Sequence, residues 1–173
     1  AGYTPLNVEF DIKDGYFVTL DEDKQVNSFT ISPTTLTVYN RSSLNVSKVD
    51  IDNETTELAG AEICITLKDT DKFLSSVELS RGGSELTRVI SFSDDNVKNG
   101  YNEYIIDGNT IKFFSNGEND TVITGLIDGD YTISEITAPD GYTTVESHDF
   151  TIANGVVKDT APNDSYDVIG ATV

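Results

Sequence analysis

Cys64 and His148 carry the side chains most often used in nucleophilic and zinc chemistry, and each is the only residue of its type in the 173-residue chain. A zinc site would have to use carboxylates as its other ligands, and a Cys–His catalytic pair would need both residues together. One cysteine excludes an internal disulfide, so we expect a buried, inert thiol. No nucleotide-binding glycine loop, nucleophile elbow or metalloprotease helix motif occurs. We therefore expect no cofactor and no enzyme that turns over a substrate.

Carboxylates are the most abundant reactive groups in the chain. Thirty Asp and Glu residues against 11 Lys and Arg give a net charge of −19. Asp50, Asp52 and Glu54 alternate as the oxygen ligands of a calcium loop do, but no glycine stands at the sixth position. These three residues are weak metal candidates, and the alternative is a solvated acidic turn. The negative charge repels nucleic acid and anionic membranes, which excludes both as expected partners.

The elements that must position any reactive group are short strands. Runs that alternate apolar and polar residues, or that are rich in β-branched residues, are separated by turn clusters such as Asp128-Gly129-Asp130 and Asn154-Gly155. No long segment has a helical period, and no apolar stretch approaches the ~20 residues of a membrane-spanning helix. The pattern predicts an all-β sandwich or partly open barrel. Predicted strands include Val8–Ile12, Tyr16–Leu20, Leu44–Val49, Ala61–Leu67, Tyr131–Ile136, His148–Ile152 and Asp167–Val173.

Two short segments recur at almost the same distance along the chain. Gly2-Tyr3-Thr4 returns 139 residues later as Gly141-Tyr142-Thr143, and the segment from Phe10 to Gly15 returns 140 residues later as Phe150 to Gly155. The echo predicts that residues 1–43 are the C-terminal strands of a preceding repeat or an N-terminal extension. Residues 44–173 then form nearly all of the next repeat, without its last strand. The alternative is two unrelated hairpins with common turn residues.

Three segments within residues 44–173 carry a family resemblance. The first is Val46–Asp50 followed by Glu57–Ile63, with Leu-Ala-Gly-Ala inside it; the second is Thr121–Ile133, with Gly-Leu-x-x-Gly-x-Tyr; the third is Ser134–Tyr142, with Glu-x-x-Ala-Pro-x-Gly-Tyr. In this order they resemble the CnaB-type domains, also described as SpaA-like or prealbumin-like, of Gram-positive pilins and adhesins. The resemblance implies an immunoglobulin-like or prealbumin-like β-sandwich, here with extra N-terminal strands.

The resemblance also implies a self-formed isopeptide bond. Many such domains join a Lys on the first strand to an Asn or Asp on the last, assisted by a Glu in the third segment; by position these are Lys48 and Glu135. The chemistry is sound, because a lysine buried in an apolar core loses its proton more readily, and a buried carboxylic acid beside it can shuttle protons. The fold supplies the contact that makes the reaction fast. The alternative is that Lys48 is an exposed strand lysine and Glu135 a salt-bridging residue at a sheet edge.

The acceptor of the bond is not fixed by the sequence. Asn40 ends a run typical of a last strand, but only seven residues separate it from Lys48, too few to set two parallel strands side by side. After Tyr142 the remaining acceptors are Asn163, Asp164 and Asp167. Three outcomes stay open. The bond is absent, it uses one of these later residues, or Asn40 of one chain enters the open edge of another copy by strand complementation.

The function expected from the resemblance is that of a secreted, extracellular structural stalk or pilin-type domain on a bacterial cell wall. Neighbouring repeats of the same surface protein are the expected partners. The alternative is an adhesin or carbohydrate-binding module on the same fold, with host matrix or glycan as ligand. Aromatic residues at Tyr101, Tyr104, Phe113 and Phe114 raise that alternative, although a place in the core explains them equally well.

Overall fold

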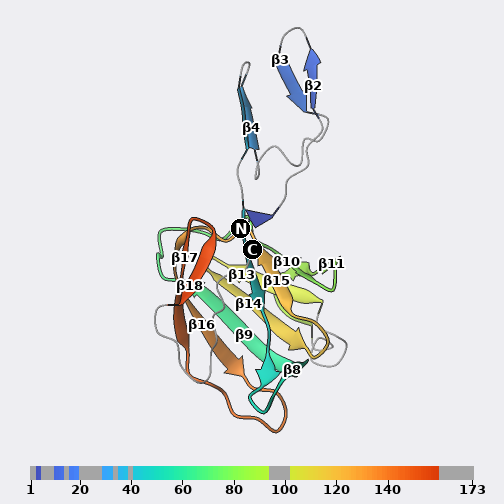
Figure 1. Ribbon diagram of the computed structural model, residues 1–173, viewed down its shortest axis with the longest axis vertical. Helices are drawn as coiled ribbons and strands as arrows, with labels where there is room; N and C mark the ends of the chain where they lie inside the picture. The colour runs from blue at the N-terminus through green and yellow to red at the C-terminus, as the bar shows by residue number, and fades with distance from the viewer. Residues whose placement is uncertain are drawn as a thin grey trace.

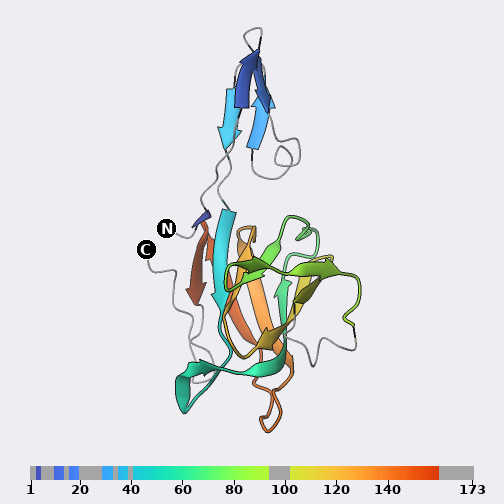
Figure 2. The same cartoon turned by 90° about the vertical axis from the view of Figure 1, so that its right-hand side faces the viewer.

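The computed structural model contains strands and no helix in the residues it describes. These are 42–93 and 102–158 with side chains, and the backbone of strand segments at 3–4, 10–13, 16–19, 29–32, 35–38, 41 and 159. Two sheets stack face to face (Figure 1), and the view turned by 90° shows them as two layers (Figure 2). The described residues include no helix long and apolar enough to cross a membrane. The predicted all-β sandwich with extra N-terminal strands is confirmed.

The smaller sheet has five strands and places the first strand of the sandwich beside β15. Its order is β1-β6-β15-β10-β11, with β1 at Tyr3–Thr4, β6 at Arg41–Val46, β15 at Thr121–Thr124, β10 at Glu78–Arg81 and β11 at Ser84–Glu85. β6 runs antiparallel to β15, with Val46 opposite Thr121. On its other side, among the described residues, β6 pairs with β1 at Arg41 and Ser42. The predicted boundary between residues 43 and 44 falls inside β6, and the assignment of residues 1–43 to a preceding repeat stays a prediction.

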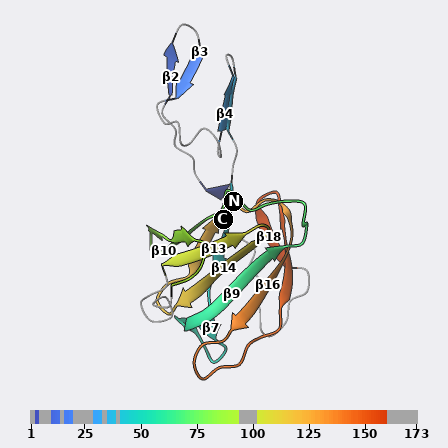
Figure 3. The ribbon, with the colours of Figure 1, turned by 180° about the vertical axis from the view of Figure 1, so that it is seen from behind.

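The larger sheet has seven strands and is built around β9. Figure 3 shows β14, β9 and β16 side by side. The order is β12-β13-β14-β9-β16-β17-β18, with β12 at Thr87–Val89, β13 at Glu103–Asp107, β14 at Thr110–Asn116, β9 at Ala59–Leu67, β16 at Gly129–Thr137, β17 at His148–Ala153 and β18 at Val156–Asp159.

The core lies between the sheets because one face of each strand is apolar. In β9 every second residue from Ala61 to Leu67 is buried, as a period of two requires when one face covers a core. Phe113 and Tyr131 from the larger sheet and Ile123 from the smaller one are almost completely buried. The Tyr131 ring stacks on Phe150, with 5.3 Å between the ring centroids. This packing fixes the relative position of the two sheets.

In the part of the chain that the structure describes, three hairpins pair only within themselves. They are β2 with β3, at Phe10–Lys13 and Tyr16–Thr19; β4 with β5, at Phe29–Ser32 and Thr35–Val38; and β7 with β8, at Val49–Asp50 and Asn53–Glu57. Hairpins β2–β3 and β4–β5 lie beyond one end of the sandwich, and β7–β8 lies at the opposite end (Figures 1 and 2).

The prediction of one continuous strand from Leu44 to Val49 is wrong. β6 ends at Val46, and the chain leaves the sheet at Ser47 and Lys48 before β7 begins. The cause is the turn back into β8, because the Leu58 amide donates to the Lys48 carbonyl over 2.7 Å and draws Lys48 away from β15. Lys48 therefore lies in a break between two strands.

Two glycines of the Gly-Leu-x-x-Gly-x-Tyr segment lie close to their neighbours. Gly125 has a φ of 85°, and a Cβ there would lie 2.3 Å from the Ser76 carbonyl oxygen, so only glycine fits without movement of the backbone. A Cβ on Gly129 would lie 2.8 Å from a methyl group at the end of the Leu67 side chain, which would have to shift. The segment thus joins β15 to β16 across the end of the core.

Candidate cross-linking site

Lys48 is held by its backbone on both sides. Its amide donates to Glu57 Oε2 over 3.0 Å, and its carbonyl accepts from the Leu58 amide. The other carboxylate oxygen of Glu57 accepts from the Ser47 hydroxyl. These contacts use the backbone of Lys48 and not its side chain, so the side chain can extend across the sandwich. The Lys48 side chain is 19% exposed.

Glu135 lies on β16 in the opposite sheet and points into the interior. Its side chain is 1% exposed, and Oε2 accepts from the Val145 amide over 3.0 Å. Oε1 lies 3.4 Å from Lys48 Nζ, an ion-pair distance. Within the described part of the chain Oε1 accepts no hydrogen bond, so the contact with Lys48 is electrostatic and its geometry is loose. One oxygen of Glu135 is anchored and the other is directed at the amine.

The loop after β16 closes the site on the side of β7. The Tyr142 amide donates to the Pro139 carbonyl over 3.0 Å, in a turn where Gly141 has a φ of 88°. This turn brings the Tyr142 hydroxyl to Asp50 Oδ2, 2.6 Å away. The hydrogen bond from Tyr142, with a second one from the Asp52 amide, holds the pKa of Asp50 below its ordinary value. The loop that carries the Val145 donor is thereby tied to the strand that follows Lys48.

Arg81 is a buried cation near the end of β15 that begins at Thr121. Its Nε donates to Thr121 Oγ1 over 2.8 Å, and Thr121 lies opposite Val46 in the sheet. Burial lowers the pKa of Arg81 to about 10, and the negative charge of Glu57 opposes that shift. Arg81 therefore stays charged at neutral pH. Glu57 attracts the Arg81 charge and also accepts the hydrogen bond from the Lys48 amide.

The sequence-predicted site residues divide into two groups. The structure brings together Lys48, in the break between β6 and β7, and Glu135, on β16 of the larger sheet. The four candidate acceptors lie outside the described residues; they are Asn40, Asn163, Asp164 and Asp167. The geometry selects none of the four, and the acceptor stays a prediction.

The weak metal candidates Asp50, Asp52 and Glu54 lie in and around the β7–β8 turn, and the Asp50 carboxylate is already occupied by Tyr142 and the Asp52 amide. Among the described residues, no group of three or more His, Cys, Asp or Glu side chains is placed to hold a metal ion.

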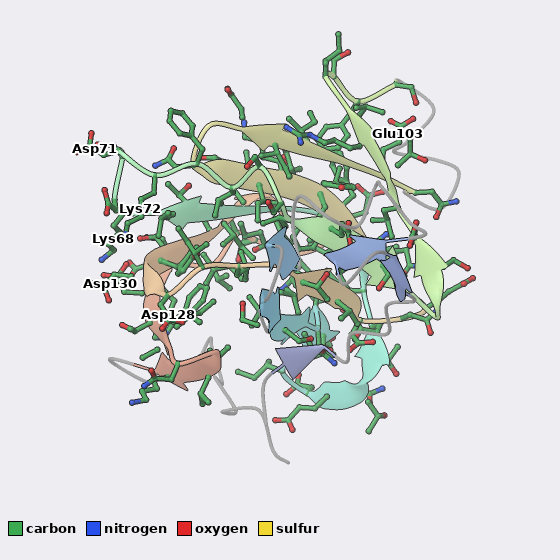
Figure 4. All side chains as sticks on the ribbon, turned by 90° about the horizontal axis from the view of Figure 1, so that it is seen from above. Lys68, Asp71, Lys72, Glu103, Asp128 and Asp130 are labelled. Atoms are coloured by element: carbon green, nitrogen blue, oxygen red, sulfur yellow. The ribbon has the colours of Figure 1, made fainter. Side chains whose placement is uncertain are left out.

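Other acidic residues serve the turns in which they stand. Asp128 accepts from the amides of Asn154 and Gly155 over 2.7 and 3.1 Å, and Asp130 accepts from the Thr151 hydroxyl over 2.7 Å. Figure 4 shows both near Lys68 along one side of the molecule, with Glu103 well apart from them. Their contacts with β17 and the β17–β18 turn make them structural.

The remaining residues singled out by type contribute to the interior. Cys64 is a buried free thiol, and His148 is buried on β17. Tyr104 and Phe113 belong to the core, and Phe114 packs edge-on against Phe92 with 4.9 Å between ring centroids. Tyr101 lies outside the described residues.

Sequence reasoning missed two groups at the site. Glu57 opens the segment that contains Leu-Ala-Gly-Ala, yet its role depends on a hairpin that brings it back to Lys48, and the sequence pattern does not predict that hairpin. The Val145 contribution is a backbone amide, for which a sequence carries no signal. A carboxylate just before the Leu-Ala-Gly-Ala segment, following a turn, is the signal that points to Glu57.

Comparison with known families matches residues 42–165 to the SpaA model, described as a prealbumin-like fold domain. The match covers Lys48, Glu135 and the two sheets of the sandwich apart from β1 and Arg41. No curated protein matches the chain.

Proposed function

Because the chain belongs to the SpaA family of prealbumin-like fold domains, we propose that it is a stalk module of a cell-wall-attached surface fibre that locks itself covalently at Lys48. The family is structural rather than enzymatic, and its domains occur in the surface pilins of Gram-positive bacteria, which are extracellular. A stalk transmits load along its strands and must resist unfolding. This chain has no disulfide to do so, since it has one cysteine.

One observation carries the proposal. Lys48 Nζ, from the break that follows β6, and Glu135 Oε1, from β16 of the larger sheet, lie 3.4 Å apart, and the Glu135 side chain is almost completely buried. An isolated buried carboxylate is costly, and a charge pair that is only loosely hydrogen-bonded recovers little of that cost. Retention of such a pair at the end of the core is explained if it performs chemistry.

The reaction follows from the two groups. Transfer of a proton from Lys48 Nζ to Glu135 Oε1 removes both charges and yields a neutral amine, which is a nucleophile. Nζ attacks the side-chain carbonyl carbon of an Asn or Asp, and Glu135 donates its proton to the leaving nitrogen or oxygen. The new bond is Nζ–C; ammonia leaves from Asn, or water from Asp; Glu135 ends with the proton lost by the attacking amine. The protein is consumed as a reactant and reacts once.

An acceptor strand fits along the edge of β6 that the described residues leave unpaired from Ser43 to Val46. Over Ser43–Val46 the described residues pair with β15 on one side, and β1 covers only Arg41 and Ser42 on the other. A strand added along this edge runs toward Lys48, which follows β6 directly. Asn163, Asp164 and Asp167 are acceptors from the same chain, and Asn40 is an acceptor from another copy.

Intact-mass spectrometry of the purified chain tests the proposal. We expect a mass about 17 Da below that of the sequence for an Asn acceptor, or about 18 Da below for Asp. Lys48→Arg should restore the full mass. Lys68→Arg is the matched control, because Lys68 forms an exposed ion pair with Asp149 and should keep the mass loss.

The outcomes separate the alternatives. A full-length monomer of unmodified mass overturns the internal bond. A covalent ladder on denaturing gels, lost in Lys48→Arg, assigns the acceptor to another copy. Mass loss that persists in Lys48→Arg removes Lys48 from the site.

A further inference from the structure

Hairpins β2–β3 and β17–β18 share one register. The paired positions are Phe10↔Thr19, Asp11↔Val18, Ile12↔Phe17 and Lys13↔Tyr16 in the first, and Phe150↔Asp159, Thr151↔Lys158, Ile152↔Val157 and Ala153↔Val156 in the second. Every residue of the first hairpin corresponds to the residue 140 positions later. The sequence echo therefore falls on two hairpins whose strands are linked by two residues, and Phe10 and Ile12 take the register positions of Phe150 and Ile152.

The second hairpin closes an edge of the larger sheet. β17 pairs with β16, with Phe150 opposite Tyr131 and Ile152 opposite Gly129. Phe150 and Ile152 are 3% and 1% exposed. The hairpin is thus bound through the backbone of β16 and through two apolar side chains that cover the core.

The first hairpin has the same residues at those positions without that sheet. Phe10 and Ile12 occupy the register positions of Phe150 and Ile152, and within the described residues β2 pairs with β3 alone. A two-stranded hairpin on its own is marginally stable in water. Among the described residues, the first hairpin has no strand beside β2 that corresponds to β16 beside β17.

We propose that β2–β3 is a sheet-closing hairpin that binds the open edge of a β16-type strand, with the pattern Gly-x-Tyr-x-Ile, in another prealbumin-like domain. In this docked arrangement β2 pairs with the β16-type strand as β17 pairs with β16, so that Phe10 lies opposite the tyrosine of the Gly-x-Tyr-x-Ile pattern. This docking joins one unit to the next through shared sheet structure. It is independent of the chemistry at Lys48.

The other N-terminal hairpin is the nearest competitor. β4–β5 has the same spacing, with Phe29 opposite Val38 and Ile31 opposite Leu36. Its two linking residues are Pro33 and Thr34, whereas β17–β18 turns through Asn154 and Gly155 at φ values of 54° and 71°. Proline cannot adopt a positive φ, but the Asp14-Gly15 pair in the first hairpin is of the residue types that do. The first hairpin is therefore the match.

A graft within the full chain tests the proposal. Residues 8–19 replace residues 148–159, twelve for twelve, which puts Phe10 and Ile12 at positions 150 and 152. Glu9 then supplies a carboxylate at position 149, where Asp149 contacts Lys68. The matched control grafts residues 7–18, which have nearly the same composition but are slipped by one residue, so that every side chain changes face.

We expect the in-register graft to unfold cooperatively with a Tm within about 10 °C of the unmodified chain. The slipped graft should lose more than about 15 °C or show no cooperative transition. The proposal is overturned if the in-register graft fails to fold, or if both grafts melt at the same temperature.

Discussion

Glu135 uses its two oxygens differently. Oε2 is fixed by the Val145 amide, and Oε1 faces Lys48 across 3.4 Å. A carboxyl group held by one oxygen keeps its orientation while the other gives and takes a proton. The same carboxylate in a purely structural ion pair would gain from hydrogen bonds to both oxygens. At the scale of single residues, this asymmetry supports the proposed role of Glu135 as a proton shuttle.

Glu135→Gln tests that role. The amide oxygen can still accept from Val145, so the fold should persist, but the side chain can no longer exchange a proton with Lys48. We expect the rate of cross-link formation to fall by about 100-fold or more, followed by intact mass over time after refolding. A variant that cross-links at the normal rate would show that Glu135 has only a structural role.

At the scale of elements, Gly125 is tightly packed in the link between β15 and β16. Gly125→Ala places a methyl group 2.3 Å from the Ser76 carbonyl oxygen, in addition to the cost of a positive φ. We expect a loss of about 3 kcal/mol in the free energy of unfolding, measured by denaturant titration.

Gly83→Ala is the matched control, because Gly83 has a φ of 81° and nothing lies within 4 Å of the position that a Cβ would take there. It should cost about 1 kcal/mol, the conformational penalty alone. Equal losses in the two variants would show that the chain around Ser76 moves to make room.

The contact between the β7–β8 hairpin and the loop after β16 depends on pH. The Tyr142 hydroxyl stabilises the ionised form of Asp50 and holds its pKa below 3.8. Its contribution to stability is present above about pH 4 and disappears as the pH falls through the lowered pKa. In an NMR titration we expect the Asp50 midpoint below 3.8, and a shift upward in Tyr142→Phe. A midpoint that does not change in Tyr142→Phe would mean that the hydrogen bond does not form in solution.

Much of the element order was predictable because the strands have strong periodic signals. β9, β14, β16 and β17 bury alternate residues, most of them apolar, and their existence and the sandwich class followed from that pattern. β8 was missed because polar, mostly exposed residues fill it, and Val49 of β7 was merged into the strand predicted from Leu44 to Val49. Their pairing depends on contacts such as Leu58 with Lys48, which a local pattern does not contain.

The same reasoning explains what was predictable at the site. The resemblance placed Lys48 and Glu135 by motif, and the structure finds them in contact. Lys48 makes this contact from the break that follows β6, because the strand predicted to continue to Val49 ends at Val46. The cross-link itself and its acceptor stay predictions, because they depend on residues outside the described part of the chain.

At the scale of the whole molecule, a bond at Lys48 would tie the start of the sandwich to its end. With an acceptor among Asn163, Asp164 and Asp167, the closed loop has more than 100 residues, and such a constraint contributes about 4–5 kcal/mol by restricting the unfolded chain. We expect Lys48→Arg to lower the free energy of unfolding by that amount, measured by denaturant titration. Lys68→Arg should change it by less than about 1 kcal/mol. Equal stability of the two variants would contradict a closed loop of this size.

The measurement that tests the cross-link most directly is tandem mass spectrometry of a proteolytic digest of the unmodified chain. We expect a branched peptide in which the Lys48 side chain is joined to a peptide containing Asn163, Asp164 or Asp167, or Asn40 of another copy. Recovery of Lys48 only in linear peptides with a free amine would contradict the proposal.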